Sequence, residues 1–507
     1  MSISKEVMMS LQNGSDVRGV ATDGVEGQPV NLTGEAANRI AGAFAMWLAE
    51  KIHSKEAGQL RIGVGHDSRI SAPQLKTQVL RGLSAAGVKA YDCSLASTPS
   101  MFMSIVYPET AFDGSIMITA SHLPFNRNGL KFFDRDGGLE KADITDLLER
   151  ACELESRDAD ISQVEEVDLL SLYAESLCEK IRLGVAAQDY DKPLQGLKVV
   201  LDAGNGAGGF FVEKVLKPLG ADTQGSQFLE PDGTFPNHIP NPENKQAMQA
   251  IQTATVNNRA DLGIIFDTDV DRMSAVLDDG KEVNRDGIIA MMAAILAPDY
   301  PGSTIVTDSV TSDKLTDFLE NSLGLHHHRF KRGYKNVINE AKRLNGEKVL
   351  TPLAIETSGH GALKENYFLD DGAYMAVKML IAAALAKKSG RKIDSLIADL
   401  KPSFECREYR MNIHGKDFKE YGGMVLEAFE KNARAAGYDV APNSYEGVRL
   451  SFGGEEVQGW MLLRLSLHDP LMPFNIEGNR PGDCDKLLEI GKKLLSSFER
   501  LDTSVLK

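Results

Sequence analysis

The feature that most constrains this chain is a repeated unit: a short apolar run that opens into a polar loop and is followed by a helix-like segment. The unit recurs in QLRIGVGHDS (59–68), LKVVLDAGNGAGG (197–209), ADLGIIFDTDVDR (260–272) and STIVTDSVTS (303–312). Strands separated by helices predict parallel sheets with right-handed crossovers. Ligand sites in such sheets gather at the carboxyl ends of the strands, which is where these polar loops fall.

The length of 507 residues is too great for one hydrophobic core. Proline-bearing polar stretches near 188–195, 299–302 and 402 predict breaks between domains. We therefore expect an α/β protein with three similar α/β domains, containing mixed or parallel sheets, over 1–188, 189–300 and 301–402. A smaller domain of α+β type is expected over 403–507. Apolar spacing predicts one clear helix from Ala373 to about Lys388, stopped by Gly390.

The composition excludes several classes of protein. A formal net charge of −16 argues against a nucleic-acid partner but leaves room for a small phosphorylated substrate. Five scattered cysteines without a CxxC pair indicate reduced thiols. The first residues show no signal or transit peptide, and the apolar runs are too short to span a bilayer. We expect a cytoplasmic protein without a membrane partner; the sequence does not indicate an oligomeric state.

Three aspartates stand at alternate positions directly after the apolar run LGIIF: Asp267, Asp269 and Asp271. Carboxylates that converge at the end of a buried strand form an oxygen-only ligand set, which suits Mg²⁺ or Ca²⁺. An EF-hand loop begins with the same spacing, but here Arg272 stands where that loop needs Gly and Asp278 where it needs Glu. A solvated acidic turn is the other alternative to a metal site.

Two glycine-bearing loops leave further alternatives open. AIETSGHGALKEN (354–366) carries Glu356, Ser358 and His360, a set that suits a polyhydroxylated ligand but also a simple connecting loop. DAGNGAGG contains the GxGxxG pattern after a strand, which offers a different class of function, an NAD(P)-dependent oxidoreductase. The three consecutive histidines at 326–328 are predicted to form a surface turn, because adjacent side chains rarely converge on one ion.

A long polar loop, TASHLPFNRNGLKFF (119–133), surrounds the single hydroxyl of Ser121. Together with DTDVDR and ETSGH, it resembles the α-D-phosphohexomutase family, which includes phosphoglucomutase, phosphomannomutase and phosphoglucosamine mutase. That family carries TASHNPxxxNGxK, DxDxDR and GExSGH loops in the same order. The resemblance covers most of the chain and implies four domains around a central cleft, three of them α/β.

The resemblance implies a phosphoryl group carried on Ser121, with Mg²⁺ held by that group and the three aspartates. The activity implied is interconversion of hexose 1-phosphate and hexose 6-phosphate, with glucose or mannose as the sugar and hexose 1,6-bisphosphate as intermediate and activator. The other site candidates are carried over residue by residue. Lys131 and His360 are the acid and base candidates, and Arg272 and Arg18 are placed near the transferred group. The sugar hydroxyls are assigned to Glu356, Ser358 and His360, and Lys331 is a further substrate-binding candidate.

The C-terminal phosphate loop departs from the family pattern. The family has RxSGTEPxxR, whereas this chain has RLSLHDPLMP from Arg464 to Pro473. Arg464 and Ser466 match and are expected to hold the non-reacting phosphate. Pro473 replaces the second Arg, and either His468 or Asn475 is expected to act as a substitute donor. This departure leaves two alternatives beside the oxidoreductase: a phosphoglucosamine mutase, and a catalytically inactive phosphosugar-binding relative.

Overall fold

The computed structural model describes residues 3–53, 56–442, 444–466 and 469–507. The chain divides into two compact units. The first comprises Met1–Asn284, Ser358–Ala362 and Leu369–Ser395, and the second comprises Arg285–Thr357, Leu363–Phe368 and Leu396–Lys507. None of the described helices is long and apolar enough to cross a membrane.

The largest sheet, in the first unit, is mixed. Its strand order is β1-β2-β6-β5-β3-β4-β8, with β7 paired to β6. β3 runs parallel to β4 and β5, while β6 runs antiparallel to β5 and β2. The strands are β1 (Gln12–Asn13), β2 (Asp16–Val20), β3 (Arg61–His66), β4 (Lys89–Leu95), β5 (Gly114–Ile118), β6 (Arg127–Asp134), β7 (Gly137–Gly138) and β8 (Glu165–Glu166).

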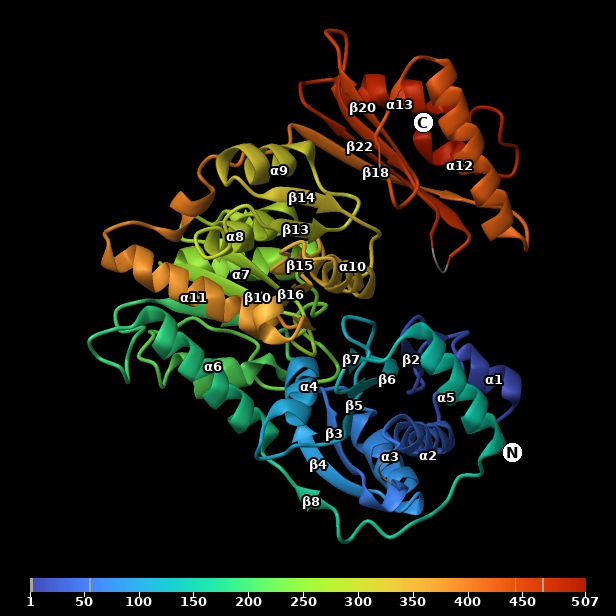
Figure 1. The fold of residues 1–507 in the computed structure, drawn as a ribbon, viewed down its shortest axis with the longest axis vertical. Helices are drawn as coiled ribbons and strands as arrows, with labels where there is room; N and C mark the ends of the chain where they lie inside the picture. The colour runs from blue at the N-terminus through green and yellow to red at the C-terminus, as the bar shows by residue number, and fades with distance from the viewer. Residues whose placement is uncertain (1–2, 54–55, 443, 467–468) are drawn as a thin grey trace. The chain divides into compact units, whose positions relative to one another are not determined.

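Helices cover both faces of this sheet. α2 and α3 lie on one side and α4 on the other (Figure 1). The start of α4 is fixed by a capping box between Ser97 and Ser100, with Pro99 in the first turn. This cap places the α4 N-terminus at the carboxyl edge of the sheet. The helices are α1 (Lys5–Ser10), α2 (Gly34–Lys51), α3 (Ala72–Ala85), α4 (Thr98–Val106) and α5 (Lys141–Glu153).

The second sheet of this unit has the order β12-β11-β10-β9, with β9 and β10 parallel. It packs with α7 and α11, and α11 also contacts α6. α11 confirms the helix predicted from Ala373 to Lys388. The elements are β9 (Val199–Asp202), β10 (Leu262–Phe266), β11 (Met273–Leu277), β12 (Glu282–Val283), α6 (Leu169–Val185), α7 (Lys245–Asn257) and α11 (Gly372–Lys388).

The second unit contains three parallel strands, with β13 between β14 and β15. The elements of this unit are β13 (Thr304–Thr307), β14 (His326–Arg329), β15 (Leu353–Ile355), α8 (Asp286–Leu296), α9 (Asp313–Asp317) and α10 (Tyr334–Gly346). Two short strands come next in the chain, β16 (Gly361–Leu363) and β17 (Leu369–Asp370), and β17 belongs to the first unit.

The histidine run forms strand β14, so the predicted surface turn was wrong. The two ring nitrogens of His327 lie 2.8 Å from the hydroxyls of Thr307 and Thr316. His328 lies 2.9 Å from Glu340. These partners satisfy the polar rings inside the sheet, which allows an edge strand where composition alone suggested solvent.

The C-terminal sheet is wholly antiparallel, with the order β18-β22-β21-β20-β19. α12 and α13 cover one face (Figure 1). On β21, Trp460 and Leu462 pack against Val310, which follows β13. The elements are β18 (Glu405–Asn412), β19 (Asp439–Val440), β20 (Val448–Gly453), β21 (Gln458–Leu463), β22 (Leu471–Gly478), α12 (Phe418–Ala435) and α13 (Asp483–Leu495). The mixed sheets and the distinct C-terminal domain confirm the predicted fold class.

Candidate active site

The three aspartates of DTDVDR form one buried cluster at the carboxyl end of β10. Asp267, Asp269 and Asp271 each offer an oxygen, and these oxygens lie within 4.8 Å of one another. All three residues are at most 1% exposed. The alternative of a solvated acidic turn is therefore wrong, because the three side chains are buried. Burial of a carboxylate needs compensating charge.

Two cations face this cluster. Lys131 Nζ lies 2.5 Å from Asp271 and 3.4 Å from Asp269. Arg272 donates to Asp267 from Nε at 3.1 Å and Nη2 at 3.0 Å. Burial and the charge of Asp271 raise the pKa of Asp267 well above its usual value. Burial has the same tendency at Asp271, but Lys131 and Arg272 outweigh it and lower the pKa there.

The donor set fits a divalent cation. Among the described residues, the buried Oδ1 atoms of Asp269 and Asp271 have no hydrogen-bond partner. Carboxylate oxygens are the ligands that hard cations such as Mg²⁺ prefer. The three acids outnumber the two side-chain cations that face them. The raised pKa of Asp267 reflects its burial and this excess of acidic groups, whose negative charge a bound metal ion would balance.

Ser121 joins this cluster from the loop after β5. Its hydroxyl donates to Asp267 at 3.0 Å and accepts from Arg272 Nη2 at 2.9 Å. The backbone of Ser121 has φ = 49°, a left-handed conformation that is costly outside glycine and often marks a functional site. Arg18 lies beside the same loop, because its guanidinium donates to the carbonyl of Thr119 at 2.6 Å.

His122 is held neutral next to Ser121. Its Nδ1 accepts from Arg272 Nη2 at 2.6 Å. Burial and the positive charge of Arg272 lower the pKa of His122 to about 3. The ring therefore fixes the position of Arg272 without adding positive charge to the cluster.

Arg69 stabilises the loop that carries Ser121, and the sequence patterns did not single out this arginine. Its fully buried guanidinium donates to four backbone carbonyls, those of Ser121, Leu123, Pro124 and Arg127. Asp67 lies 3.3 Å from Arg69 and accepts from the Thr119 hydroxyl at 2.6 Å. The one sequence feature that could have indicated Arg69 is its position in the polar loop directly after β3.

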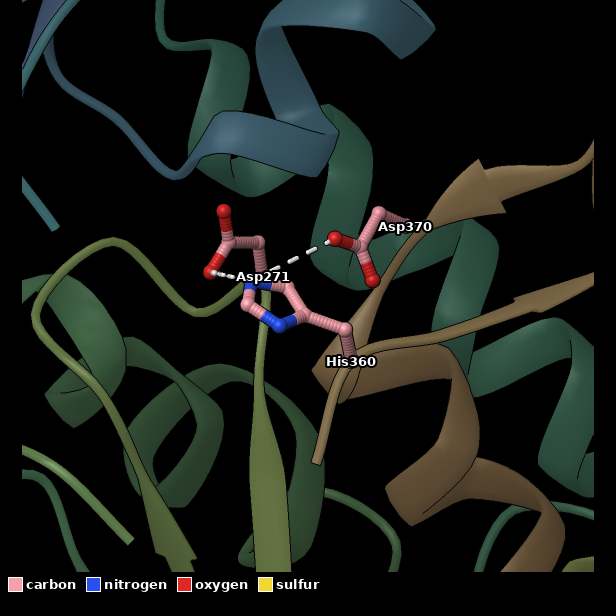
Figure 2. A group of neighbouring side chains, drawn as sticks. All are labelled: Asp271, His360 and Asp370. Atoms are coloured by element: carbon pink, nitrogen blue, oxygen red, sulfur yellow. Dashed lines mark ion pairs between the residues drawn. The ribbon is translucent and has the colours of Figure 1, made fainter. Parts of the chain in front are cut away.

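His360 faces two carboxylates, one of them not predicted. Its Nε2 lies 3.7 Å from Asp271 and 3.6 Å from Asp370. Figure 2 shows the ring directed toward both. The Ser358 hydroxyl lies 2.9 Å from the other ring nitrogen. Burial and the nearby Arg272 lower the pKa of His360 well below its usual value. Asp370 immediately precedes the N-cap of α11, a context that usually indicates a structural acid.

The remaining candidates lie in the second unit. Glu356, directly after β15, is buried and accepts from the Gly333 N–H at 2.6 Å. Lys331 is exposed, with Nζ 6.0 Å from the Phe330 ring. Arg464 follows β21 and is 9% exposed. Ser466 accepts from the Asp469 N–H at 3.2 Å. His468 lies outside the described residues.

The GxGxxG glycines are used for internal packing. A Cβ on Gly206 would lie 2.5 Å from the carbonyl of Thr268, inside the aspartate loop. A Cβ on Gly209 would lie 2.1 Å from the carbonyl of Leu229. These glycines let neighbouring loops approach closely, so they do not support the oxidoreductase alternative.

Family models identify the chain. The models for the α/β/α domains I, II and III of phosphoglucomutase/phosphomannomutase match residues 10–158, 172–280 and 284–404. These matches cover most of the chain. The protein belongs to the phosphoglucomutase/phosphomannomutase family of α-D-phosphohexomutases, and it is therefore a mutase, an enzyme of the isomerase class.

Individual relatives span nearly the whole chain. The phosphomannomutase/phosphoglucomutase of Pseudomonas putida is 27% identical over 476 residues, which cover 92% of this chain and 95% of that one. A probable phosphoglucosamine mutase of Methanocella arvoryzae is 29% identical over 482 residues, covering 94% and 96%. A solved phosphoglucomutase/phosphomannomutase family structure from Burkholderia thailandensis has a TM-score of 0.77 at 24% identity, covers 98% of both chains and shows the same fold.

Replacing Arg69 with Leu is expected to destabilise the first unit. The change leaves Asp67 and several carbonyls without their buried partner, a loss of about 3–5 kcal/mol. Thermal and urea unfolding followed by circular dichroism measure it. Lys217→Ala, which breaks an exposed ion pair with Glu213 in the same unit, is the control and should cost about 1 kcal/mol or less. An Arg69→Leu protein as stable as this control would contradict the role of Arg69.

Stability is expected to depend on pH through Glu356. Burial and the charge of Asp308 raise its pKa to about 7, above the 4.5 of an ordinary glutamate. The fold therefore favours the neutral acid, and stability is lost as the pH rises through about 7. Glu356→Gln should be more stable than wild type at pH 8.5, by up to about 3 kcal/mol, and nearly equal to it at pH 5.

The measurement is the difference in melting temperature between variant and wild type at the two pH values. Glu347→Gln, on the exposed end of α10, is the control and should show the same difference at both. A Glu356→Gln effect that does not change with pH would contradict the raised pKa.

Proposed function

We propose that this enzyme interconverts hexose 1-phosphate and hexose 6-phosphate, with glucose or mannose as the sugar, by means of a phosphoryl group carried on Ser121. The observation that carries the proposal is the placement of the Ser121 hydroxyl against Asp267 and Arg272, at 3.0 and 2.9 Å. A serine hydroxyl alone is a poor nucleophile, and phosphoryl transfer depends mainly on positioning and charge. The buried cluster supplies both.

The reaction has two matched halves. Phosphorylated Ser121 gives its phosphoryl group to the free hydroxyl of the sugar phosphate, so the bond from phosphorus to Oγ breaks and a bond to the sugar oxygen forms. One of Lys131 and His360 takes the hydroxyl proton, and the other returns a proton to Oγ. The resulting hexose 1,6-bisphosphate turns by about half a turn while it stays bound. Its other phosphoryl group then returns to Ser121, and free bisphosphate acts as activator.

Mg²⁺ is the proposed metal, and Asp267, Asp269 and Asp271 would hold it together with the phosphorylated Ser121. When bound, it supplies neutralisation of the charge on the transferring phosphoryl group. Arg272 stabilises the same charge. Arg18 lies close to the transferring group because it donates a hydrogen bond to the carbonyl of Thr119, in the loop that carries Ser121. The buried carboxylate oxygens without hydrogen-bond partners support this assignment.

The sugar phosphate is proposed to bind through two further sets of residues. Glu356, Ser358 and His360 accept hydrogen bonds from sugar hydroxyls. Glu356 suits this role because one carboxylate can accept two hydrogen bonds. Lys331, Arg464, Ser466 and His468 hold the non-reacting phosphate. We also propose that the boundaries between the domains lie near residues 188, 300 and 402. We propose the cytoplasm as the compartment of this enzyme, because its five cysteines are free thiols.

A hexosamine phosphate is the second candidate substrate. The observation that favours it is the probable phosphoglucosamine mutase of Methanocella arvoryzae, which aligns with 94% of this chain. The altered loop at 464–473 is compatible with either sugar, because its proposed role is to hold the phosphate and not the sugar hydroxyls.

The test is an assay of 6-phosphate formation from glucose, mannose and glucosamine 1-phosphates, with Mg²⁺ and a trace of hexose 1,6-bisphosphate. We expect turnover of glucose or mannose 1-phosphate. EDTA and Ser121→Ala should each abolish it, by at least about 1,000-fold for the variant, because the phosphoryl carrier is lost. Ser162→Ala, on an exposed turn, should retain full activity. Binding of these sugars without any turnover would instead indicate an inactive relative.

A further inference from the structure

One carboxylate in the second unit, that of Glu446, joins two arginine-bearing segments. Its Oε2 accepts from the Ser309 hydroxyl at 2.5 Å and from the backbone N–H of Arg332 at 3.0 Å. Its Oε1 lies 3.7 Å from the guanidinium of Arg464. The side chain is therefore fixed through one oxygen and directs the other toward Arg464.

The charged side chains of Arg332 and Arg464 belong to one electrostatic group. Burial lowers the pKa of Arg464; the charge of Arg332 lowers it further, and that of Glu446 opposes the shift. Arg332 Nε also lies 3.8 Å from the buried carboxylate of Asp308. Two neighbouring guanidinium groups, one buried on Arg464 and one partly exposed on Arg332, repel each other unless an anion is present. In the unliganded protein, Glu446 supplies part of that negative charge.

Arg464 retains capacity for a ligand. It is 9% exposed, and its Nε is buried without a hydrogen-bond partner among the described residues. A buried guanidinium donor of this kind costs free energy until it is satisfied. Phosphate oxygens are suitable acceptors, because the planar guanidinium matches them in a two-pronged geometry.

The segment after β13, which begins with Asp308, is fixed to the C-terminal sheet by buried contacts. Arg449 donates from β20 to the carbonyls of Ser309 and Thr311, both at 3.2 Å. The Ser312 hydroxyl donates to Glu477 at 2.6 Å. These bonds hold the segment after β13 against the sheet that carries Arg464, so the arrangement around Glu446 is built into the unit.

The C-terminal phosphate loop itself supplies a single guanidinium, so the phosphate needs further positive charge from outside the loop, beyond that already proposed for Lys331. Pro473 stands where the phosphate loop of the resembling family ends in Arg, and its carbonyl accepts from the Arg464 N–H at 3.1 Å. Within 464–473, Arg464 is the only arginine or lysine. A phosphate dianion held by one guanidinium is incompletely neutralised.

We propose that Arg332 supplies the second guanidinium for the non-reacting phosphate, with Arg464 as the first, and that Glu446 occupies part of the phosphate position until substrate displaces it. This inference rests on the proposed phosphosugar function. Glu446 keeps its bonds to Ser309 and to the Arg332 backbone through Oε2. When substrate binds, Oε1 turns away from Arg464. Among the described residues this breaks only its long contact with that guanidinium, and the phosphate gains both guanidinium groups.

The test measures binding in a Ser121→Ala background, where turnover is removed, by calorimetric titration with glucose 6-phosphate and mannose 6-phosphate. Arg332→Ala should weaken binding by about 10- to 100-fold, because a charged hydrogen-bonding group is lost. Arg332→Lys should recover only part of the affinity, since it keeps the charge but not the fork. Glu446→Gln should tighten binding severalfold, because the competing charge is removed while an acceptor oxygen remains.

Arg434→Ala is the matched control, because its guanidinium forms an exposed ion pair with Glu430 on α12 and should not affect binding. If Arg332→Ala binds like this control, or if Glu446→Gln binds no more tightly than its parent, the inference is wrong. Should Arg332→Ala fail to fold, Arg332→Lys and Glu446→Gln still decide the question. A parent protein that binds neither sugar phosphate would overturn the proposed function itself, and this inference with it.

Discussion

The burial of three carboxylates at the end of β10 is the constraint on which the first unit depends. Carboxylates removed from water need positive charge and hydrogen bonds to remain ionised. Two sheets supply them: Lys131 comes from β6 of the large sheet, and Arg272 leads directly into β11. At the start of α4, Thr98 donates to Asp269 through both its backbone N–H and its hydroxyl. Electrostatic compensation therefore joins the two sheets at the place where Ser121 lies.

The second unit follows the same principle with different residues. Asp308 and Glu356 are buried acids with raised pKa values, held next to the charge of Arg332. The segment that carries them is fixed to the C-terminal sheet by Arg449, whose guanidinium stacks 3.7 Å from the centre of the Trp460 ring. In both units, buried charges that cost stability are concentrated at the ends of strands. This cost is the usual consequence of building a binding site before the ligand arrives.

The sequence predicted the features that have a local signature. Strand ends marked by polar loops predicted the α/β fold, and alternate aspartates after an apolar run predicted a buried acidic cluster. Arg69 was missed because it acts through backbone carbonyls, which leave no pattern of side chains. Glu446 was missed because Ser309 and Arg332, its hydrogen-bond partners, lie more than a hundred residues away in the sequence, and only folding brings them together. Asp370 was missed although His360 is only ten residues away, because its place just before the N-cap of α11 looks like that of a structural acid. The histidine run was mispredicted because Thr307, Thr316 and Glu340, which are far apart in the sequence, lie within hydrogen-bond distance of the His327 and His328 rings.

The central claim is that Ser121 carries the phosphoryl group, and peptide mass spectrometry of the intact enzyme tests it most directly. The protein is incubated with glucose 1,6-bisphosphate and Mg²⁺, freed of small molecules, and then exposed to glucose 1-phosphate or mannose 1-phosphate. The account predicts a single phosphate on the peptide that contains Ser121, which is lost or exchanged when the sugar phosphate is added. A peptide that remains unmodified under these conditions, or a phosphate found only on another residue, would contradict it.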